Sequence, residues 1–410
     1  MRGICRANRR SFSFEGLKET AYAGALLDQG VIAVLNRRAF VASLPAAALV
    51  ARDVFAQPTL KTQRAFLGTT GKDAQGIFTA SFDAKTGQFD QPQMAIKIPG
   101  NDSMALSPKN RKHLYVSAAM NGGAMVSALE ITGDVAQPLR QINQQSATGT
   151  IANMVSVDVS GRVVMEANWG SGSINTYLVQ PDGGIGPAVE HIEYGEADHG
   201  PAPQQPHSRA HSILNTRDGK FVLVNDYGKD RLYIYRLDAA TAKLTPHDPF
   251  VWKGTAGSAP RHLVLHPNGK WIYCVNEISN TVDLLLWDAK QGTLTLKSTV
   301  STLPEGHAKS YASDLLISPD NRFLYAGNRG VNGFTVWSIG RDGALTQIQF
   351  REQTGAQNRC MVNDATGRWM IAANVSTNDI TVFPRDPKTG MLGAMASQTK
   401  LPGACFVLWG

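Results

Sequence analysis

Two segments of the sequence share one pattern: His266-Pro267-Asn268-Gly269-Lys270-Trp271-Ile272-Tyr273-Cys274-Val275-Asn276 and Ser318-Pro319-Asp320-Asn321-Arg322-Phe323-Leu324-Tyr325-Ala326-Gly327-Asn328. Each begins with a turn rich in Pro, Asn, Asp and Gly, passes through a basic residue into an apolar strand, and ends on Asn. The side chain of Asn can bond the backbone of a following turn. The pattern therefore predicts a short β-strand between two turns.

Weaker copies of this turn occur along the chain, centred near Asn110, Gly161, Gly219 and Gly367. Together with Gly269 and Asn321 they recur every 46 to 58 residues. A repeat of about fifty residues is typical of a four-stranded propeller blade. Five of the apolar strands end on Asn or Asp, namely Asn168, Asp226, Asn276, Asn328 and Asn374. We expect these five side chains to bond the turns that follow them.

Six anchored repeats leave both ends of the chain without a blade. Strand-forming residues occur at Phe66-Leu67-Gly68 and at 77–82, and the apolar run 404–409 follows Pro402-Gly403. These segments can pair into a seventh blade, which would leave few exposed sheet edges. We therefore predict an all-β, seven-bladed propeller over residues 57–410, with four-stranded blades and a ring closed by N- and C-terminal strands. The alternative is that the last strand packs elsewhere.

The charge of the chain does not indicate a nucleic-acid partner. The formal net charge is +7, but eight of the 40 basic and four of the 33 acidic residues lie in 1–56. The remaining 32 basic and 29 acidic residues give only about +3, without a basic run interleaved with aromatics. The four cysteines form no C-x-x-C pair and no zinc-site spacing, and we expect Cys274 and Cys405 to be buried free thiols.

Residues 1–56 are predicted to be a twin-arginine export signal. Asn36-Arg37-Arg38-Ala39-Phe40-Val41 precedes an apolar run that ends in Val54-Phe55-Ala56 before Gln57-Pro58. About a dozen apolar residues are too few for a permanent membrane span. Cleavage after Ala56 would release the propeller into the periplasm, without a membrane span in the mature form. A translation start near Leu35 would account for the unusual length before the arginines.

A family resemblance rests on three stretches between residues 205 and 390. The first is Ala259-Pro260-Arg261-His262-Leu263, continuing to Val275-Asn276-Glu277. The second combines Ser313-Asp314 with Gly327-Asn328-Arg329-Gly330, and the third combines His211-Ser212 with Asp226-Tyr227-Gly228. They resemble the seven-bladed propeller lactonases, the family of 6-phosphogluconolactonases and carboxy-cis,cis-muconate cyclases. The resemblance implies a lactone hydrolase, or the reverse ring closure, acting on a sugar-derived or other acidic lactone without a cofactor or metal.

Four catalytic residues are implied by the resemblance. His211 would transfer a proton, because a histidine can titrate near neutral pH. Arg261 and Arg329 would hold a substrate carboxylate or phosphate and the developing oxyanion. Glu277 would act as acid or base, or only orient Arg261. The implied substrate-binding residues are His207, Arg209, Asp314 and Arg359, although Arg209 replaces a histidine and Asn358 replaces a proline of the family pattern.

Two alternatives remain open at the level of sequence. His199, His207 and His211 could hold a metal ion, but the prolines between them favour a loop over the helix that this spacing needs. The chain could also be a non-catalytic propeller that binds a protein or glycan partner. An enzyme requires His211, Arg261, Glu277 and Arg329 to converge on one cavity, whereas a scaffold does not. The sequence predicts neither the particular lactone nor the oligomeric state.

Overall fold

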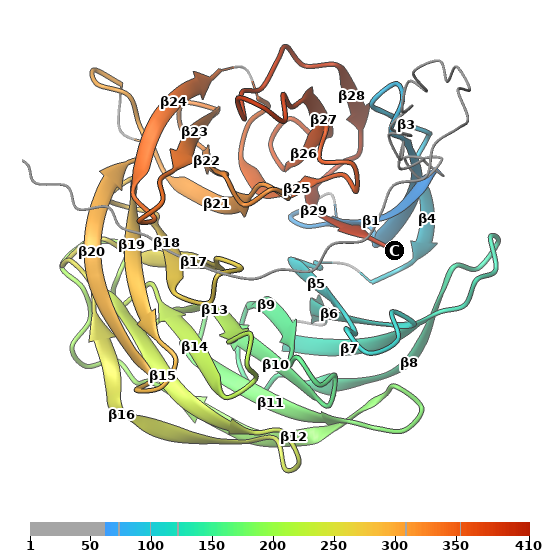
Figure 1. The fold of residues 1–410 in the computed structure, drawn as a ribbon. Coiled ribbons are helices and arrows are strands. Elements are labelled where there is room, and N and C mark those ends of the chain that lie inside the picture. The colour runs from blue at the N-terminus through green and yellow to red at the C-terminus, as the bar shows by residue number, and fades with distance from the viewer. Residues whose placement is uncertain (1–61, 73, 99, 121–122, 308–309, 353) are drawn as a thin grey trace, which may run out of the picture. The chain divides into compact units, whose positions relative to one another are not determined.

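The computed structural model describes residues 62–410 apart from positions 73, 99, 121–122, 308–309 and 353. The predicted export signal at 1–56 lies outside these residues. All named elements of the described chain are β-strands, arranged as seven sheets around a common axis (Figure 1). No helix among the described residues is long and apolar enough to cross a membrane.

In blades 2 to 7 the sheet is an antiparallel meander whose first strand lies nearest the axis (Figure 1). Blades 2 to 4 each have four strands, which run in chain order: β5 (Ser103–Leu106), β6 (His113–Met120), β7 (Gly123–Ile131) and β8 (Leu139–Ser146); β9 (Ala152–Val157), β10 (Val163–Asn168), β11 (Ser173–Val179) and β12 (Ile185–Glu193); β13 (Ala210–Asn215), β14 (Phe221–Asp226), β15 (Arg231–Asp238) and β16 (Lys243–Lys253).

Blades 5 to 7 repeat the same order. Their strands are β17 (Pro260–Leu265), β18 (Trp271–Asn276), β19 (Thr281–Asp288) and β20 (Thr293–Ser301); β21 (Ala312–Ile317), β22 (Phe323–Asn328), β23 (Gly333–Ile339) and β24 (Leu345–Arg351); β25 (Asn358–Asn363), β26 (Trp369–Asn374), β27 (Asp379–Pro384) and β28 (Ser397–Lys400). The seven-bladed, all-β prediction is confirmed.

The remaining blade joins the two ends of the described chain. The C-terminal strand β29 (Ala404–Trp409) pairs antiparallel with β1 (Gln63–Thr69), with Leu67 opposite Val407. β1 pairs in turn with β2 (Ile77–Asp83). The outermost position differs from the predicted single strand, because β3 (Gln88–Phe89) and β4 (Gln93–Ile96) both pair with β2. The ring is therefore closed by hydrogen bonds between N- and C-terminal strands, as predicted.

The turn residues that revealed the repeat hold a left-handed backbone. Gly219 and Gly269 have φ angles of 73° and 70°, and Asn321 has 60°, a region that favours Gly and tolerates Asn. In blade 2 the equivalent residue is Arg111, at 52°, which explains why this copy was weak in the sequence. The requirement for positive φ thus produced the recurring Gly and Asn residues.

The strand-ending Asn side chains bond differently from the expectation. Asn276 donates to the carboxylate of Asp283, and Asn374 donates to Thr381 Oγ1 at 3.0 Å, so both side chains bridge the second and third strands. Only Asp226 accepts from the following turn, at the backbone N of Gly228. For the Asn residues, the local-turn prediction was wrong because the third strand offers a partner at the same level.

The hydrophobic core lies between neighbouring blades. One cluster packs Phe221 and Leu223 of blade 4 against Ile272 and Leu285 of blade 5, all buried. Burial of each such side chain contributes about 1.5–3 kcal/mol. Cys274, Cys360 and Cys405 are buried free thiols within this layer, as expected for Cys274 and Cys405.

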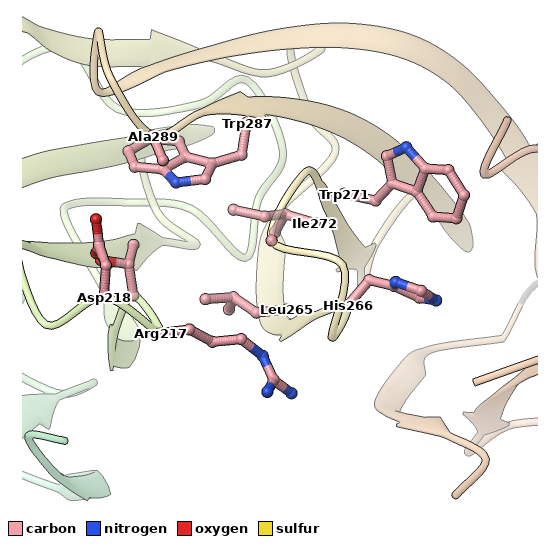
Figure 2. Close-up of a pocket in the computed structure, with 10 residues that line it drawn as sticks. Arg217, Asp218, Leu265, His266, Trp271, Ile272, Trp287 and Ala289 are labelled. Carbon is pink, nitrogen blue, oxygen red and sulfur yellow. The ribbon is translucent and has the colours of Figure 1, made fainter. Parts of the chain in front are cut away.

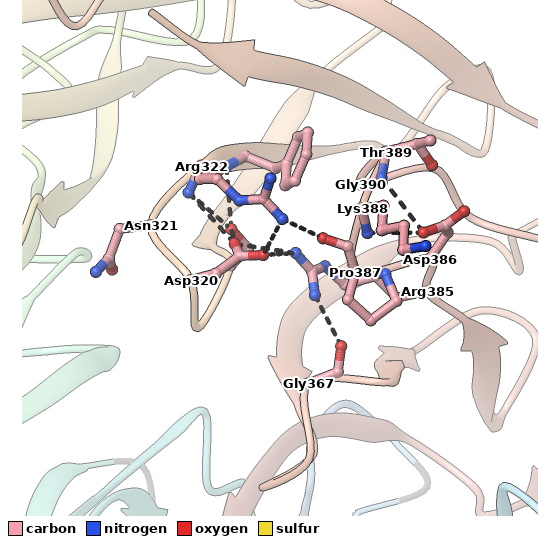
Figure 3. Close-up of polar contacts among 12 residues, drawn as sticks. Asp320, Asn321, Arg322, Gly367, Arg385, Asp386, Pro387, Lys388, Thr389 and Gly390 are labelled. Atoms are coloured by element: carbon pink, nitrogen blue, oxygen red, sulfur yellow. Dashed lines mark hydrogen bonds and ion pairs between the residues drawn. The ribbon is translucent and has the colours of Figure 1, made fainter. Parts of the chain in front are cut away.

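Polar contacts also join blades, as they do between blades 6 and 7 (Figure 3). The buried guanidinium of Arg385 donates to both oxygens of Asp320, at 3.0 and 2.9 Å. Its remaining donors reach the hydroxyl of Tyr325 at 2.8 Å and the carbonyl of Gly367 at 2.9 Å. A buried charge is costly unless it is paired and hydrogen-bonded, so this arrangement fixes the position of blade 7 against blade 6.

Candidate active site

A polar cavity of about 200 Å³ opens where the innermost strands of the blades meet. It is lined by Asp102, Ile151, Asn153, Trp169, His211, Arg261, Glu277, Arg329 and Arg359. These residues come from blades 2 to 7 and span more than half of the chain. The cavity therefore exists only in the closed ring.

Local breaks in strand pairing direct several of these side chains to the cavity. In blade 5, Pro260 pairs with Asn276 and His262 pairs with the adjacent Val275, so Arg261 has no partner across the ladder. A β-bulge of this kind re-aims the extra side chain. The same shift occurs at the second residue of the innermost strand in four other blades, at Asn153, His211, Arg359 and Cys405. All but Cys405 line the cavity.

A second set of cavity residues follows the strand-ending Asn or Asp. Trp169, Glu277 and Arg329 each come directly after such a residue. Their backbone N–H groups donate to the residue that precedes the innermost strand, at 2.8 Å for Glu277 and 2.9 Å for Trp169. Blades 3 and 5 thus place both kinds of position in the cavity, whereas blades 4, 6 and 7 each contribute one of the two.

The carboxylate of Glu277 joins two arginines from different blades. Its Oε2 atom lies 2.9 Å from Nε of Arg261 and forms an ion pair with Arg329. Within the described chain its Oε1 atom accepts no hydrogen bond. Arg261 is only 2% exposed and also donates to the carbonyl of Ser313. The structure thus brings three of the predicted catalytic residues into contact.

Burial and the neighbouring Arg329 lower the pKa of Arg261 to about 9, although Glu277 opposes the shift. The group remains protonated at neutral pH. With Arg329 and Arg359 it places three guanidinium groups around the cavity, against the two carboxylates of Asp102 and Glu277. The lining therefore carries an excess of positive charge.

His211 is held in one tautomer by Asn153 of the neighbouring blade. The Nδ2 atom of Asn153 lies 2.8 Å from the carbonyl oxygen of His211 and 3.0 Å from its Nδ1. Because Nδ2 can only donate, Nδ1 accepts and Nε2 carries the hydrogen. Burial, followed by the charges of Arg261 and His262, holds the pKa of His211 well below its usual value. His211 is therefore neutral at pH 7, which differs from the expectation that it titrates near neutrality.

The predicted substrate-binding residues have different surroundings. Arg359 lines the cavity and lies 3.8 Å from Asp102. Arg209 stacks on Trp169, with its guanidinium carbon 3.7 Å from the ring centroid. Asp314 lies behind the cavity, where Oδ1 contacts Nδ1 of His262 at 2.9 Å and Oδ2 accepts from the backbone of Met361. Both of its oxygens are therefore used within the protein.

His207 does not line the cavity. Its Nδ1 atom lies 2.7 Å from the carbonyl of Ser208, within its own loop. His199 similarly contacts the carbonyl of Gly200. No group of three or more His, Cys, Asp or Glu side chains within the described residues could hold a metal ion.

Four cavity residues were missed from the sequence: Asp102, Ile151, Asn153 and Trp169. Trp169 follows Asn168 just as Glu277 follows Asn276, so counting from the strand-ending Asn could have found it. Asn153 is the second residue of its strand, like Arg261. Asp102 and Ile151 had no comparable signal, because the family resemblance was faint in the first two hundred residues.

A second hollow lies between blades 4 and 5 (Figure 2). Its wall is mostly apolar and includes Leu265, Ile272 and Trp287. Thr216 lines it and follows the end of β13, whereas His211 is near the beginning of that strand, roughly 16 Å away along an extended chain. This hollow is therefore separate from the polar cavity and offers no comparable convergence of charged groups.

Residues 64–409 match the family described as lactonase, 7-bladed beta-propeller. The chain belongs to the seven-bladed β-propeller lactonase family. The 6-phosphogluconolactonase of Bacillus subtilis is 28% identical to this lactonase over 340 residues, covering 82% of the chain and 95% of the relative. That of Serratia proteamaculans is 30% identical over 303 residues, covering 73% and 86% respectively.

The fold of this lactonase also matches the solved structure of the periplasmic gluconolactonase of Pseudomonas aeruginosa. The TM-score is 0.79 at 23% identity, over 85% of this chain and 99% of that one. At this identity the likeness concerns the fold. The family match and the curated relatives confirm the predicted family and the assignment as a lactone-hydrolysing enzyme, and the non-catalytic alternative is not favoured.

Proposed function

We propose that this lactonase hydrolyses small acidic lactones, with sugar-derived lactones as the first class to test. The observation that carries the proposal is the pairing of Glu277 Oε2 with both Arg261 and Arg329, while its Oε1 atom accepts no hydrogen bond from the described residues. A carboxylate oriented in this way can accept a proton from water. The two guanidinium groups lie beside it, where charge develops on the substrate.

In the proposed reaction, Glu277 takes a proton from a water molecule as the water oxygen attacks the lactone carbonyl. The C–O bond formed gives a tetrahedral oxyanion, which Arg261 and Arg329 stabilise through fixed donors. When the ring C–O bond breaks, Glu277 returns the proton to the leaving oxygen. The product is an open hydroxy acid, and its carboxyl proton is released to solvent.

His211 has a different proposed role from the proton transfer expected from the sequence. Its Nδ1 lone pair accepts from Asn153, so the group available to a substrate is the Nε2–H. A neutral imidazole can donate this hydrogen bond to a substrate oxygen without giving up the proton. We assign His211 to orienting the lactone, while Glu277 moves the proton.

The charge of the cavity favours a substrate with a negative group. Three arginines face two carboxylates, and a carboxylate on the substrate would balance the lining. We place Arg359 as the contact for this group, because its only carboxylate partner in the described chain is Asp102, at the long distance of 3.8 Å.

The proposal includes export through the twin-arginine segment, with the propeller at 57–410 acting in the periplasm. Export argues against phosphorylated sugar lactones, which are mainly cytoplasmic. Non-phosphorylated acidic lactones are therefore the preferred class.

The test is hydrolysis of a panel of γ- and δ-lactones by the full chain and by Glu277→Gln. Loss of the base should lower kcat by about 10²- to 10⁴-fold. The exposed Glu305→Gln serves as the matched control and should retain parental rates. Equal rates in Glu277→Gln and the parent would overturn the assignment of the base, and no turnover of any lactone by the parent would overturn the activity.

A further inference from the structure

Part of the cavity wall is apolar and comes from a single blade. Ile151 and Trp169 of blade 3 line the cavity whose charged side, Arg261, Glu277 and Arg329, belongs to blades 5 and 6. The mechanism proposed above uses neither of these two side chains. They lie on adjacent loops, and the backbone N–H of Trp169 donates to the carbonyl of Ile151 at 2.9 Å. The two residues therefore form one braced unit, which we call the apolar wall.

Ile151 is costly to the fold in two ways. Its φ angle is 55°, a left-handed conformation that β-branched residues rarely adopt, and its side chain is 50% exposed. The equivalent residues before the innermost strands of blades 5, 7 and 1 are Ala259, Gln357 and Gly403, which also have positive φ. Four of the seven blades thus share this backbone at the position before the innermost strand, and among these four only blade 3 places isoleucine on it. Strain of this kind is concentrated at functional sites.

Trp169 is held in place on one face of its ring. The guanidinium carbon of Arg209 lies 3.7 Å from the ring centroid, and Tyr227 contacts the indole edge-on with a centroid separation of 6.4 Å. Arg209 has no ion-pair partner within the described residues, so the stack is its main contact. A cation over an indole at this distance is an attractive interaction. Trp169 therefore presents a rigid aromatic surface to the cavity.

We propose that the apolar wall of Ile151 and Trp169 is a platform for the C–H face of the lactone ring, so that the site selects lactone rings over open-chain esters. This inference rests on the proposed lactonase reaction and names what recognises the ring. An aromatic surface stacks on flat C–H faces, and the arginines across the cavity then meet the polar edge of the same ring. Arg209 acts as a positioning residue for Trp169.

Binding separates this platform from the hydrolytic chemistry. The unreactive D-glucono-1,5-lactam, titrated by calorimetry, should bind Trp169→Ala about tenfold more weakly than the parent and Trp169→Phe within about threefold. In kinetics with D-glucono-1,5-lactone, Trp169→Ala should raise KM by about tenfold with a small change in kcat. The methyl ester of D-gluconic acid, which has no ring, should be turned over equally by the parent and Trp169→Ala.

Ile151→Gly provides a test that a purely structural role would not pass. Relief of the left-handed strain should raise Tm, while loss of the side chain should weaken lactam binding by about threefold. The exposed Thr148, with φ of 47°, lies in the same loop but does not line the cavity. Thr148→Gly should therefore raise Tm without changing lactam binding.

The outcomes distinguish the platform from the activity. Unchanged lactam binding by Trp169→Ala, or no binding of the lactam by the parent, overturns the platform even if lactones are hydrolysed. Lactam binding that depends on Trp169 in a protein that hydrolyses no lactone supports the platform and overturns the proposed reaction. An equal loss of activity on the ring lactone and on the methyl ester also overturns ring selection.

Discussion

The side-chain nitrogen of Asn153 lies 3.0 Å from Nδ1 of His211 and 2.8 Å from the carbonyl oxygen of the same residue. The two residues belong to different blades, Asn153 to strand β9 of blade 3 and His211 to strand β13 of blade 4, and both occupy the bulged position of their strand. One amide group thus sets both the tautomer and the orientation of the imidazole. The hydrogen available to a substrate is therefore determined by a neighbouring blade.

Removal of this amide should change the imidazole without removing it. In Asn153→Ala, Nδ1 loses its donor, so we expect a mixture of tautomers and a decrease in kcat of about tenfold, since the oriented Nε2–H is diluted. The ¹⁵N spectrum of the histidine side chains reads the tautomer directly. Asn143→Ala removes contacts to the backbone of Ile185 outside the site and should change neither. A pure Nε2–H tautomer in Asn153→Ala would contradict this role.

Glu166 is a buried carboxyl group outside the active site. Burial, opposed in part by hydrogen bonds from Asn175 and Asn168, raises its pKa to about 8 from the ordinary value of 4.5. Below pH 4.5 the carboxyl is protonated in both states. Between about pH 4.5 and pH 8 the unfolded chain releases a proton that the folded protein retains, so the free energy of unfolding decreases as the pH rises through this range.

Glu166→Gln should remove this pH dependence. The advantage of the variant over the parent in free energy of unfolding should grow between pH 5 and pH 8 to a few kcal/mol, since one pKa unit corresponds to about 1.4 kcal/mol. Urea unfolding at several pH values provides the measurement. For the exposed Glu305→Gln the difference from the parent should stay constant with pH. A constant difference for Glu166→Gln as well would mean that Glu166 titrates normally.

The Asp320–Arg385 pair between blades 6 and 7 should contribute more than a surface pair. Asp320→Asn leaves a nearly buried guanidinium without its counter-charge, and should lower the free energy of unfolding by about 3 kcal/mol. Adding Arg385→Met should restore part of this loss, because no unpaired charge then remains. Asp342→Asn, which breaks the exposed pair with Lys297, should cost much less than Asp320→Asn, because an exposed ion pair contributes little to stability. Similar losses in free energy of unfolding for Asp320→Asn and Asp342→Asn would show that the buried pair contributes no more than the exposed one.

Arg359 should discriminate between acidic and neutral lactones. Arg359→Gln is expected to raise KM for D-glucaro-1,4-lactone by about tenfold or more, because one charge-assisted hydrogen bond is lost. KM for the uncharged D-glucono-1,5-lactone should change by less than about threefold. The exposed Arg341→Gln should leave both values unchanged. Equal effects on the two lactones would show that Arg359 does not contact the charged group.

The sequence was most informative where the fold requires a particular backbone. Gly219, Gly269 and Asn321 mark turns because positive φ restricts the choice of residue, and their spacing predicted the blades. The divided outer strand of blade 1 was not predicted, because β3 and β4 are short and contain no buried residue, so little apolar periodicity identifies them.

The residues of the site were harder to predict from the sequence than the fold, for a physical reason. The bulge at Arg261 depends on how one strand pairs with the next, and no residue type marks such a shift. His207 was predicted to bind substrate because it lies two residues before Arg209 in the family motif, but its ring contacts the backbone of its own loop. Ile151 is recognisable only once its backbone angle is known. Residue identity therefore indicated the chemistry of blades 4 to 7, and the repeat could have indicated Trp169, whereas Asp102 and Ile151 were found only in the structure.

The bulges have a consequence for how such an enzyme can diverge. A bulged residue has no partner in the ladder, so its replacement leaves the hydrogen bonds that hold the blade intact. The equivalent positions already hold five side chains as different as Asn153, His211, Arg261, Arg359 and Cys405. New substrate preferences can therefore evolve one blade at a time, through single substitutions at the axis that leave strand pairing unaltered.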